Sequence, residues 1–213
     1  MRSAGLRARS WRVAVCVAGM AFALPAHAQA HMTAPGMGDF ISGVLHPWMT
    51  PTHLLILIAL GLWLGQHVPL RVGLPLKLFV PVSAVALALT TRHWMAAVPP
   101  PVLIAIALVA GAIVALEVRL PNYAAAVLLA VAAAAIGLDS GLETGTPFAV
   151  FKTLLGTWVS LGIGLVNVGY YVSLATERKK KWISIGVRVA GSWIVAVSLM
   201  MLAFAWRKST ASM

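Results

Sequence analysis

Six long apolar runs follow one another along the chain, and they constrain its fold more than any other feature. Each comes near the roughly 20 residues that a helix needs to cross the hydrocarbon core of a bilayer. The runs cover approximately residues 40–65, 78–91, 102–117, 124–138, 148–174 and 183–205. They are continuous, unlike the short alternating strands of a membrane β-barrel. We therefore predict an all-α, polytopic membrane helix bundle with about six transmembrane helices.

The overall composition excludes a soluble domain. The chain is 61% hydrophobic and 10% charged, with a mean hydropathy of +0.92, whereas soluble domains are about 45–50% apolar and about 25% charged. Its formal net charge of +11 would suit a nucleic acid as partner. The basic residues, however, sit in short loops between the apolar runs. We therefore expect the lipid bilayer, and not nucleic acid, as a partner of this chain.

The first 30 residues have the three regions of a secretory signal peptide. A basic segment at 1–12 and a short apolar segment at 13–24 precede an Ala-Gln-Ala sequence at 28–30, which permits cleavage before His31. An Ala-His-Ala sequence just before it permits cleavage two residues earlier. An uncleaved first transmembrane helix is the alternative, but the short apolar segment argues against it. We predict a signal peptide at 1–30.

The remaining residues, 31–213, form the predicted six-helix transmembrane domain, with its N-terminus outside the cytoplasm. In that orientation the loops at about 66–77, 118–122 and 175–182 are cytoplasmic. They hold seven Lys and Arg residues, against four in the outer loops and tail, as the positive-inside rule requires. The signal peptide and this topology together predict a multi-pass protein of the bacterial inner membrane.

Two histidines lie beside prolines at the start of the first run. His46 and His53 are seven residues apart, which on a regular helix separates them by about 10.5 Å along the axis. One ion with bonds near 2.0–2.1 Å to each imidazole cannot bridge that gap. Pro47 and Pro51 each remove a backbone donor and disrupt a helical turn. The two rings then either come closer together or form successive stations on a path.

Such histidines are costly at membrane depth unless they are used. Irregular backbone is tolerated there only where it is buried in protein or lines a wet cavity, and polar side chains within the bilayer usually have a function. We interpret His46 and His53 as a site for a metal ion or a proton. Structural packing of hydrogen-bonded rings is the alternative.

Further candidate ligands lie at the outer face. Asp139 and Glu143 leave the fourth run in a glycine-rich loop, and carboxylates with imidazoles suit divalent first-row metals; a solvated turn is the alternative. His31, if cleavage makes it the first residue, can chelate an ion with its amine and imidazole; a disordered terminus is the alternative. We predict His46, His53, Glu143, Asp139 and His31 as metal ligands.

No catalytic constellation stands out. The sequence lacks the common motifs of serine hydrolases, zinc proteases and phosphate-binding loops. Ser140 follows Asp139, but a nucleophile needs a positioned base. The lone cysteine, Cys16, falls in the predicted signal peptide, so the mature chain has neither a thiolate nor a disulfide. We predict no enzymatic activity and no tightly bound cofactor.

Taken together, these features resemble the HupE/UreJ family over nearly all of the mature chain. The resemblance rests on the leader, the histidine soon after it, the six-run layout, the entry segment with His46, Pro47 and His53, and the run Gly61–Trp63. In the family's second signature, Gly141–Glu143 match. The family is associated with nickel or cobalt uptake for hydrogenase and urease maturation.

Some positions depart from the family signatures. Thr50 and Thr52 stand where a glycine and an aspartate are expected, and Ile136 and Ser140 stand at the positions of two histidines. Asp139, which directly precedes Ser140, is a candidate to compensate for the missing side chains.

The resemblance implies a permease for a divalent transition metal, Ni²⁺ first, with Co²⁺ or copper also open. Transport would follow a gradient or be drawn by cytoplasmic trapping. The implied partners are a hydrogenase or urease maturation system, or further copies of this chain in a homo-oligomer. The departures from the signatures leave an alternative, namely a non-transporting accessory or metal-sensing membrane protein that kept the family's bundle.

Overall fold

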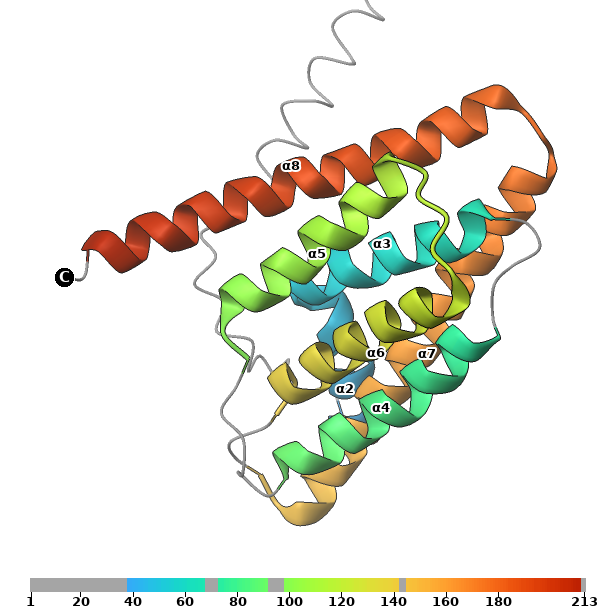
Figure 1. The fold of residues 1–213 in the computed structure, drawn as a ribbon. Coiled ribbons are helices and arrows are strands. Elements are labelled where there is room, and N and C mark those ends of the chain that lie inside the picture. The colour runs from blue at the N-terminus through green and yellow to red at the C-terminus, as the bar shows by residue number, and fades with distance from the viewer. Residues whose placement is uncertain (1–37, 68–72, 92–97, 142–144, 212–213) are drawn as a thin grey trace, which may run out of the picture. The chain divides into compact units, whose positions relative to one another are not determined.

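The fold is seen in a computed structural model that describes residues 38–67, 73–91, 98–141 and 145–211. All regular secondary structure in these residues is helical (Figure 1), which confirms the predicted all-α bundle. The helices are α2 (Asp39–Met49), α3 (Pro51–Gln66), α4 (Leu74–Thr90), α5 (Pro100–Ala115), α6 (Asn122–Asp139), α7 (Pro147–Glu177) and α8 (Lys181–Ala211). The predicted signal peptide lies outside the described residues and stays a prediction.

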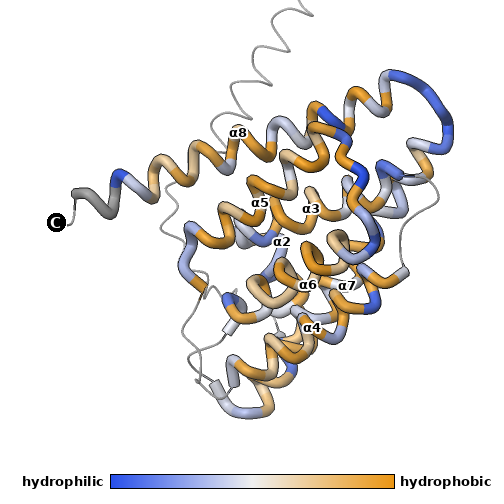
Figure 2. Tube along the Cα trace, viewed as in Figure 1, coloured by the Kyte–Doolittle hydropathy of each residue, from blue (hydrophilic) through white to orange (hydrophobic). Residues whose placement is uncertain are grey.

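The helices coincide with the six apolar runs of the sequence. Within the described residues, α6, α7 and α8 are long and apolar enough to cross a membrane, and α2 with α3 forms a fourth such unit that is bent by 73°. α4 and α5 are apolar but shorter, with 17 and 16 residues. Figure 2 shows the apolar colouring along these helices and a hydrophilic loop between α7 and α8. The chain is a helical membrane bundle, whereas its count of six spans remains a prediction.

Proline marks the start of four of these helices. Pro51, Pro100 and Pro147 are the first residues of α3, α5 and α7, and Pro75 is the second residue of α4. Proline suits these positions because the N–H groups of the first turn have no intrahelical acceptor. The apolar runs thus determine helix length, and the prolines determine where the helices begin.

α3 lies at the centre of the packing. Nearly every residue from Ile56 to Gln66 is buried, and α3 packs against α7, α5, α2 and α8. Gly61 and Gly65 allow α7 to approach closely, since a Cβ atom at Gly65 would collide with the carbonyl oxygen of Gly169. Small residues are the usual means of close helix packing in lipid, where apolar burial between helices provides little driving force.

Polar side chains gather at the two ends of α3. At its start, His53 meets Asp139, the last residue of α6. Near its end, Trp63 donates to the carbonyl of Val118, just beyond α5. α7 runs parallel to α3, so the basic segment 178–181, where α7 ends and α8 begins, lies toward the Trp63 end. The positive-inside rule predicts that the Trp63 end is the cytoplasmic, inner end and that the His53 end is the outer end; this orientation stays a prediction.

Candidate metal-binding site

The α2–α3 pair is broken at a single residue, Thr50. Its backbone is extended, with φ −90° and ψ 110°, as expected for a residue that precedes a proline, here Pro51. The amide and the hydroxyl of Thr50 both donate to the carbonyl oxygen of His46, at 3.1 and 3.0 Å. The local sequence therefore ends α2 and redirects the chain by 73° between the two predicted histidine ligands.

Hydroxyl groups of α7 satisfy the backbone near this break. Pro47 has no N–H, so the carbonyl of Gly43, four residues earlier, loses its helical donor. The Thr157 hydroxyl lies 3.1 Å from that oxygen and replaces the donor. Ser160 donates to the neighbouring carbonyl of Val44 at 2.7 Å. A buried carbonyl without a donor costs about 1–3 kcal/mol, so these contacts from α7 stabilise the broken segment.

The break brings the two histidine rings together. The ring centroids of His46 and His53 are 5.4 Å apart, and the ring planes meet at 66°. Two imidazoles that bind one ion tetrahedrally, with bonds of about 2.0–2.1 Å, have centroids roughly 5 Å apart. Of the two arrangements that the prolines allow, the structure has the one in which the rings approach each other, at a separation that suits a shared ion.

His53 is held by a carboxylate from another helix. Its Nε2 lies 2.9 Å from Oδ2 of Asp139, and because the carboxylate accepts, Nε2–H is the donor. The His53 side chain is fully buried and that of Asp139 is 21% exposed. In the neutral ring the lone pair is then on Nδ1, which has no hydrogen-bond partner among the described residues. Metal-binding histidines commonly have this carboxylate partner on their second nitrogen.

Three of the five predicted ligands gather at the outer end. His46 and His53 face each other, and Asp139 contacts His53 in the position of an orienting partner. Within the described ranges, no group of three or more His, Cys, Asp or Glu side chains is arranged to hold a metal ion by itself. Glu143 and His31 lie outside those ranges, so their role as further ligands stays a prediction.

The residues that replace the expected family ligands are partly or fully buried within the bundle. Ile136 is fully buried in the core, and the Ser140 hydroxyl donates to the Ile136 carbonyl at 2.7 Å. Thr52 is half-buried. A carboxylate from another helix does reach His53, that of Asp139 at the end of α6; that it compensates for the one absent at Thr52 stays a prediction.

Sequence reasoning missed the residues that support the break. Trp48 Nε1 donates to Ser160 at 2.8 Å, and Thr157 and Ser160 contact the α2 backbone. Ser160 lies among the glycines of the fifth run, where small residues predict close packing. Thr153, Thr157 and Ser160 follow one another at intervals of four and three residues, so they share one face of α7. This spacing is the sequence signal that could have identified them as a polar stripe.

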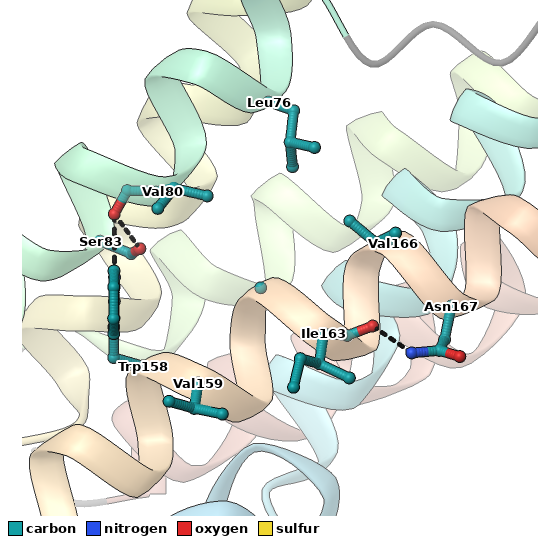
Figure 3. A pocket seen from close by; sticks show the side chains of 9 residues that line it. Leu76, Val80, Ser83, Trp158, Val159, Ile163, Val166 and Asn167 are labelled. Carbon is teal, nitrogen blue, oxygen red and sulfur yellow. Dashed lines mark hydrogen bonds between the residues drawn. The ribbon is translucent and has the colours of Figure 1, made fainter.

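A separate groove lies between α4 and α7 (Figure 3). Its volume is about 460 Å³, and it is lined by Leu76, Val80, Ser83, Trp158, Val159, Gly162, Ile163, Val166 and Asn167. The lining is mostly apolar, and its polar groups bond to backbone: Trp158 Nε1 donates to Val80 at 3.0 Å, and Asn167 donates to Ile163 at 2.8 Å. None of the predicted ligands that the structure describes lines this groove.

Comparison with known proteins agrees with the architecture. The chain matches the family model described as HupE / UreJ protein over residues 16–201. No curated protein and no solved structure matches it. The family match includes α2 to α7 and most of α8. This chain therefore belongs to the HupE/UreJ family of membrane proteins.

Proposed function

We propose that the protein transports a divalent transition metal ion, nickel before cobalt or copper, across the bacterial inner membrane. Membership of the HupE/UreJ family supports a role in metal transport, and a hydrogenase or urease maturation system is the proposed destination. The 213 residues contain no phosphate-binding glycine loop. In this proposal the ion therefore follows a gradient or is drawn inward by cytoplasmic trapping.

One observation carries the proposal: the fully buried His53 has a ring nitrogen with no hydrogen-bond partner among the described residues, and it lies beside a second histidine. An ion from the outer side would bind Nδ1 of His53 and the ring of His46, while Asp139 orients His53. Leaving a buried nitrogen unbonded in a membrane interior costs free energy, which binding an ion would recover. Paired imidazoles favour nickel, cobalt or copper over magnesium and calcium.

A second candidate is a non-transporting accessory or metal-sensing protein. Thr52, Ile136 and Ser140 replace the side chains expected at the family's ligand positions, and this observation favours it. In that case the outer site would bind an ion without passing it on.

Uptake of radioactive nickel separates the two candidates. The protein is expressed in a bacterial strain without its own nickel importers, beside a His46→Ala/His53→Ala variant and an Asn167→Ala control on the exposed side of α7. We expect uptake by the unmodified protein and the control, and uptake at the empty-vector level for the double variant. Equal amounts of protein in the membrane are verified by immunoblotting.

Two results would contradict transport through this site. Full uptake by the double variant would remove His46 and His53 from the pathway. An unmodified protein that binds nickel but takes up neither nickel, cobalt nor copper would establish the accessory or sensing role instead.

Asp139 offers a finer test of the site. In an Asp139→Asn variant an amide oxygen still accepts from His53 Nε2, but the negative charge is lost. We expect nickel affinity to fall about 10–100-fold, the usual effect of removing an orienting partner, with the fold retained. Affinity is measured by equilibrium dialysis of the purified protein, and an unchanged value would remove Asp139 from the site.

A further inference from the structure

Basic side chains gather where α5 ends and α8 begins. The two helices run antiparallel, since a Cβ atom at Gly111 would meet Ile194 and one at Gly191 would meet the backbone of Ala115. The end of α5 therefore lies beside the beginning of α8. Figure 2 shows hydrophilic residues in the turn between α7 and α8 and in the segment after α5. The exposed cations at this end, which we call the basic face, are Arg119, Arg178, Lys179, Lys180, Lys181 and Arg188.

The basic face carries an excess of positive charge. Glu117 and Glu177 are exposed at the same end, but neither forms an ion pair with these cations in the part of the chain that the structure describes. Six Lys and Arg side chains thus stand against two carboxylates. A surface with such an excess attracts an anionic partner.

Arg188 is the cation of this face that lies furthest inside a candidate membrane span, Lys181–Arg207. It follows Lys181 by seven residues, or about 10.5 Å along the helix axis. Its neighbours Ile185 and Val189 are exposed, so an apolar surface surrounds it on α8. Charged side chains within a span are costly and are nearly always paired or functional. An exposed arginine on such a surface therefore calls for an anionic group close by.

One hydrogen bond anchors Arg188 against α5. Its Nε donates to the carbonyl oxygen of Ala115, the last residue of α5, at 3.1 Å. Capping of α5 explains this contact, but it uses one of the five N–H donors of the guanidinium. The planar fork of an arginine suits the oxygens of a phosphate, which it binds with two parallel hydrogen bonds. The anchored side chain is thus suited to hold a phosphate at the end of α5.

Large apolar side chains are exposed beside the cations. Trp182, next to Lys181, is 68% exposed, and Leu116, directly after α5, is 72% exposed. Tryptophan favours the boundary between headgroups and acyl chains. A small soluble anion would use only the cations, whereas a phospholipid has a phosphate for them and acyl chains for the apolar residues. The combination of charge and apolar surface therefore favours a lipid.

We propose that the basic face binds an anionic phospholipid, with Arg188 as the principal ligand of the headgroup phosphate. The neighbouring lysines and arginines contribute through their summed positive charge. Basic groups just beyond a span, or between spans, are a common means of recognising anionic headgroups. This inference concerns a surface of the bundle, and it rests neither on metal transport nor on the orientation of the chain in the membrane.

Lipid binding to the full-length protein tests the basic face. The purified protein in a neutral detergent is titrated with phosphatidylglycerol and, separately, with phosphatidylcholine, and bound lipid is counted by native mass spectrometry. We expect a preference for phosphatidylglycerol. An Arg188→Gln variant still has an N–H group to donate to Ala115, but it should bind phosphatidylglycerol at least about fivefold more weakly, the usual contribution of one cation near an anionic lipid.

A Lys152→Gln variant is the matched control, because it removes a cation that lies on α7 and pairs with Asp39. It should bind phosphatidylglycerol as the unmodified protein does. Equal affinity of Arg188→Gln and the unmodified protein for this lipid would overturn the proposal. Equal affinity of the unmodified protein for the two lipids would overturn it as well, since the headgroup charge would then go unrecognised.

A soluble phosphate separates a lipid site from a site for small anions. Glycerol 3-phosphate offers similar phosphate chemistry without acyl chains, and sodium chloride of equal ionic strength controls for screening. We expect glycerol 3-phosphate to displace no more phosphatidylglycerol than the salt does. Greater displacement would assign the basic face to a soluble anion and contradict a lipid site.

Thermal unfolding tests whether Arg188 only caps α5. In phosphatidylcholine nanodiscs, Arg188→Gln should unfold near the temperature of the unmodified protein. Inclusion of phosphatidylglycerol should raise the unfolding temperature of the unmodified protein more than that of the variant, because a ligand stabilises the folded state that binds it. A variant that is destabilised equally in both lipids would show a capping role alone and would contradict the proposal.

Discussion

α7 and α8 have the same length, 31 residues each, yet they contribute differently to the bundle. In their most apolar windows, 44% of the residues of α7 are buried, against 17% for α8. α7 packs along both α2 and α3, whereas α8 packs chiefly on α5. Length and hydropathy therefore make both helices candidate spans, but they do not indicate which one supports the site.

The difference lies in the side chains that face the break. Gly156 brings the backbone of α7 against the carbonyl of Phe40, and Thr157 and Ser160 bond to carbonyls of α2. On α8, a Cβ atom at Gly186 would meet none of the described residues within 4 Å. Small and hydroxyl-bearing residues on one face thus turn an ordinary span into a support for a broken helix.

Gly156→Leu should have the largest effect. Its side chain would displace the backbone of α2, so we expect a loss of about 3 kcal/mol or more, at the upper end of overpacking effects, together with loss of nickel uptake. Gly186→Leu is the matched control on α8 and should fold and transport normally. Thermal unfolding in detergent, followed by tryptophan fluorescence, measures the stability of both. Similar unfolding temperatures for the two variants would contradict the inference that α7 supports the bundle more closely than α8.

Removing the α7 hydroxyls should have the next largest effect. In a Thr157→Val variant the carbonyl of Gly43 loses the donor that replaces the missing N–H of Pro47, at a cost of about 1–3 kcal/mol. Nickel affinity should fall with it, since the break positions His46. The control is Ser192→Ala on α8, whose hydroxyl donates to the carbonyl of Arg188 in its own helix. Denaturant titration and nickel dialysis are compared, and equal losses in both variants would count against a special role for α7.

The ion pair at the outer end of α7 should matter less. Lys152 Nζ lies 2.6 Å from Oδ2 of Asp39, and both side chains are 38% exposed. Exposed pairs contribute about 0.2–1 kcal/mol and weaken in salt. We expect Lys152→Met to lower stability within that range at low ionic strength and to have no effect in high salt. A larger loss that persists in high salt would show that Lys152 has a further role.

Ser198→Ala on α8 should have the smallest effect. The Ser198 hydroxyl is fully buried and has no hydrogen-bond partner among the described residues. Removing it relieves an unpaired polar group, so stability should stay the same or rise by up to about 1 kcal/mol. A marked loss of stability, seen by thermal unfolding, would show that the Ser198 hydroxyl makes a stabilising contact. The polar side chains of α7 and α8 would then contribute more similarly to stability.

The sequence predicted the bundle because apolar length is a local property. It also placed the two histidines beside the break, because proline acts on its own neighbours in the chain. It could not predict that Asp139 would reach His53, 86 residues away, or that Ser160 would bond to Trp48, 112 residues away. Such contacts depend on which helix faces are paired, and hydropathy does not specify this pairing.

The distance between the polar ends of α3 has an electrical consequence. His53 and Gln66 are about 20 Å apart along the helix, which is about two thirds of the roughly 30 Å hydrocarbon core across which the membrane voltage falls. One elementary charge that crosses the whole voltage changes its energy by about 2.3 kcal/mol per 100 mV. A doubly charged ion would therefore gain about 3 kcal/mol per 100 mV between the two ends. A cell interior held negative would drive the ion inward along α3 and oppose its return.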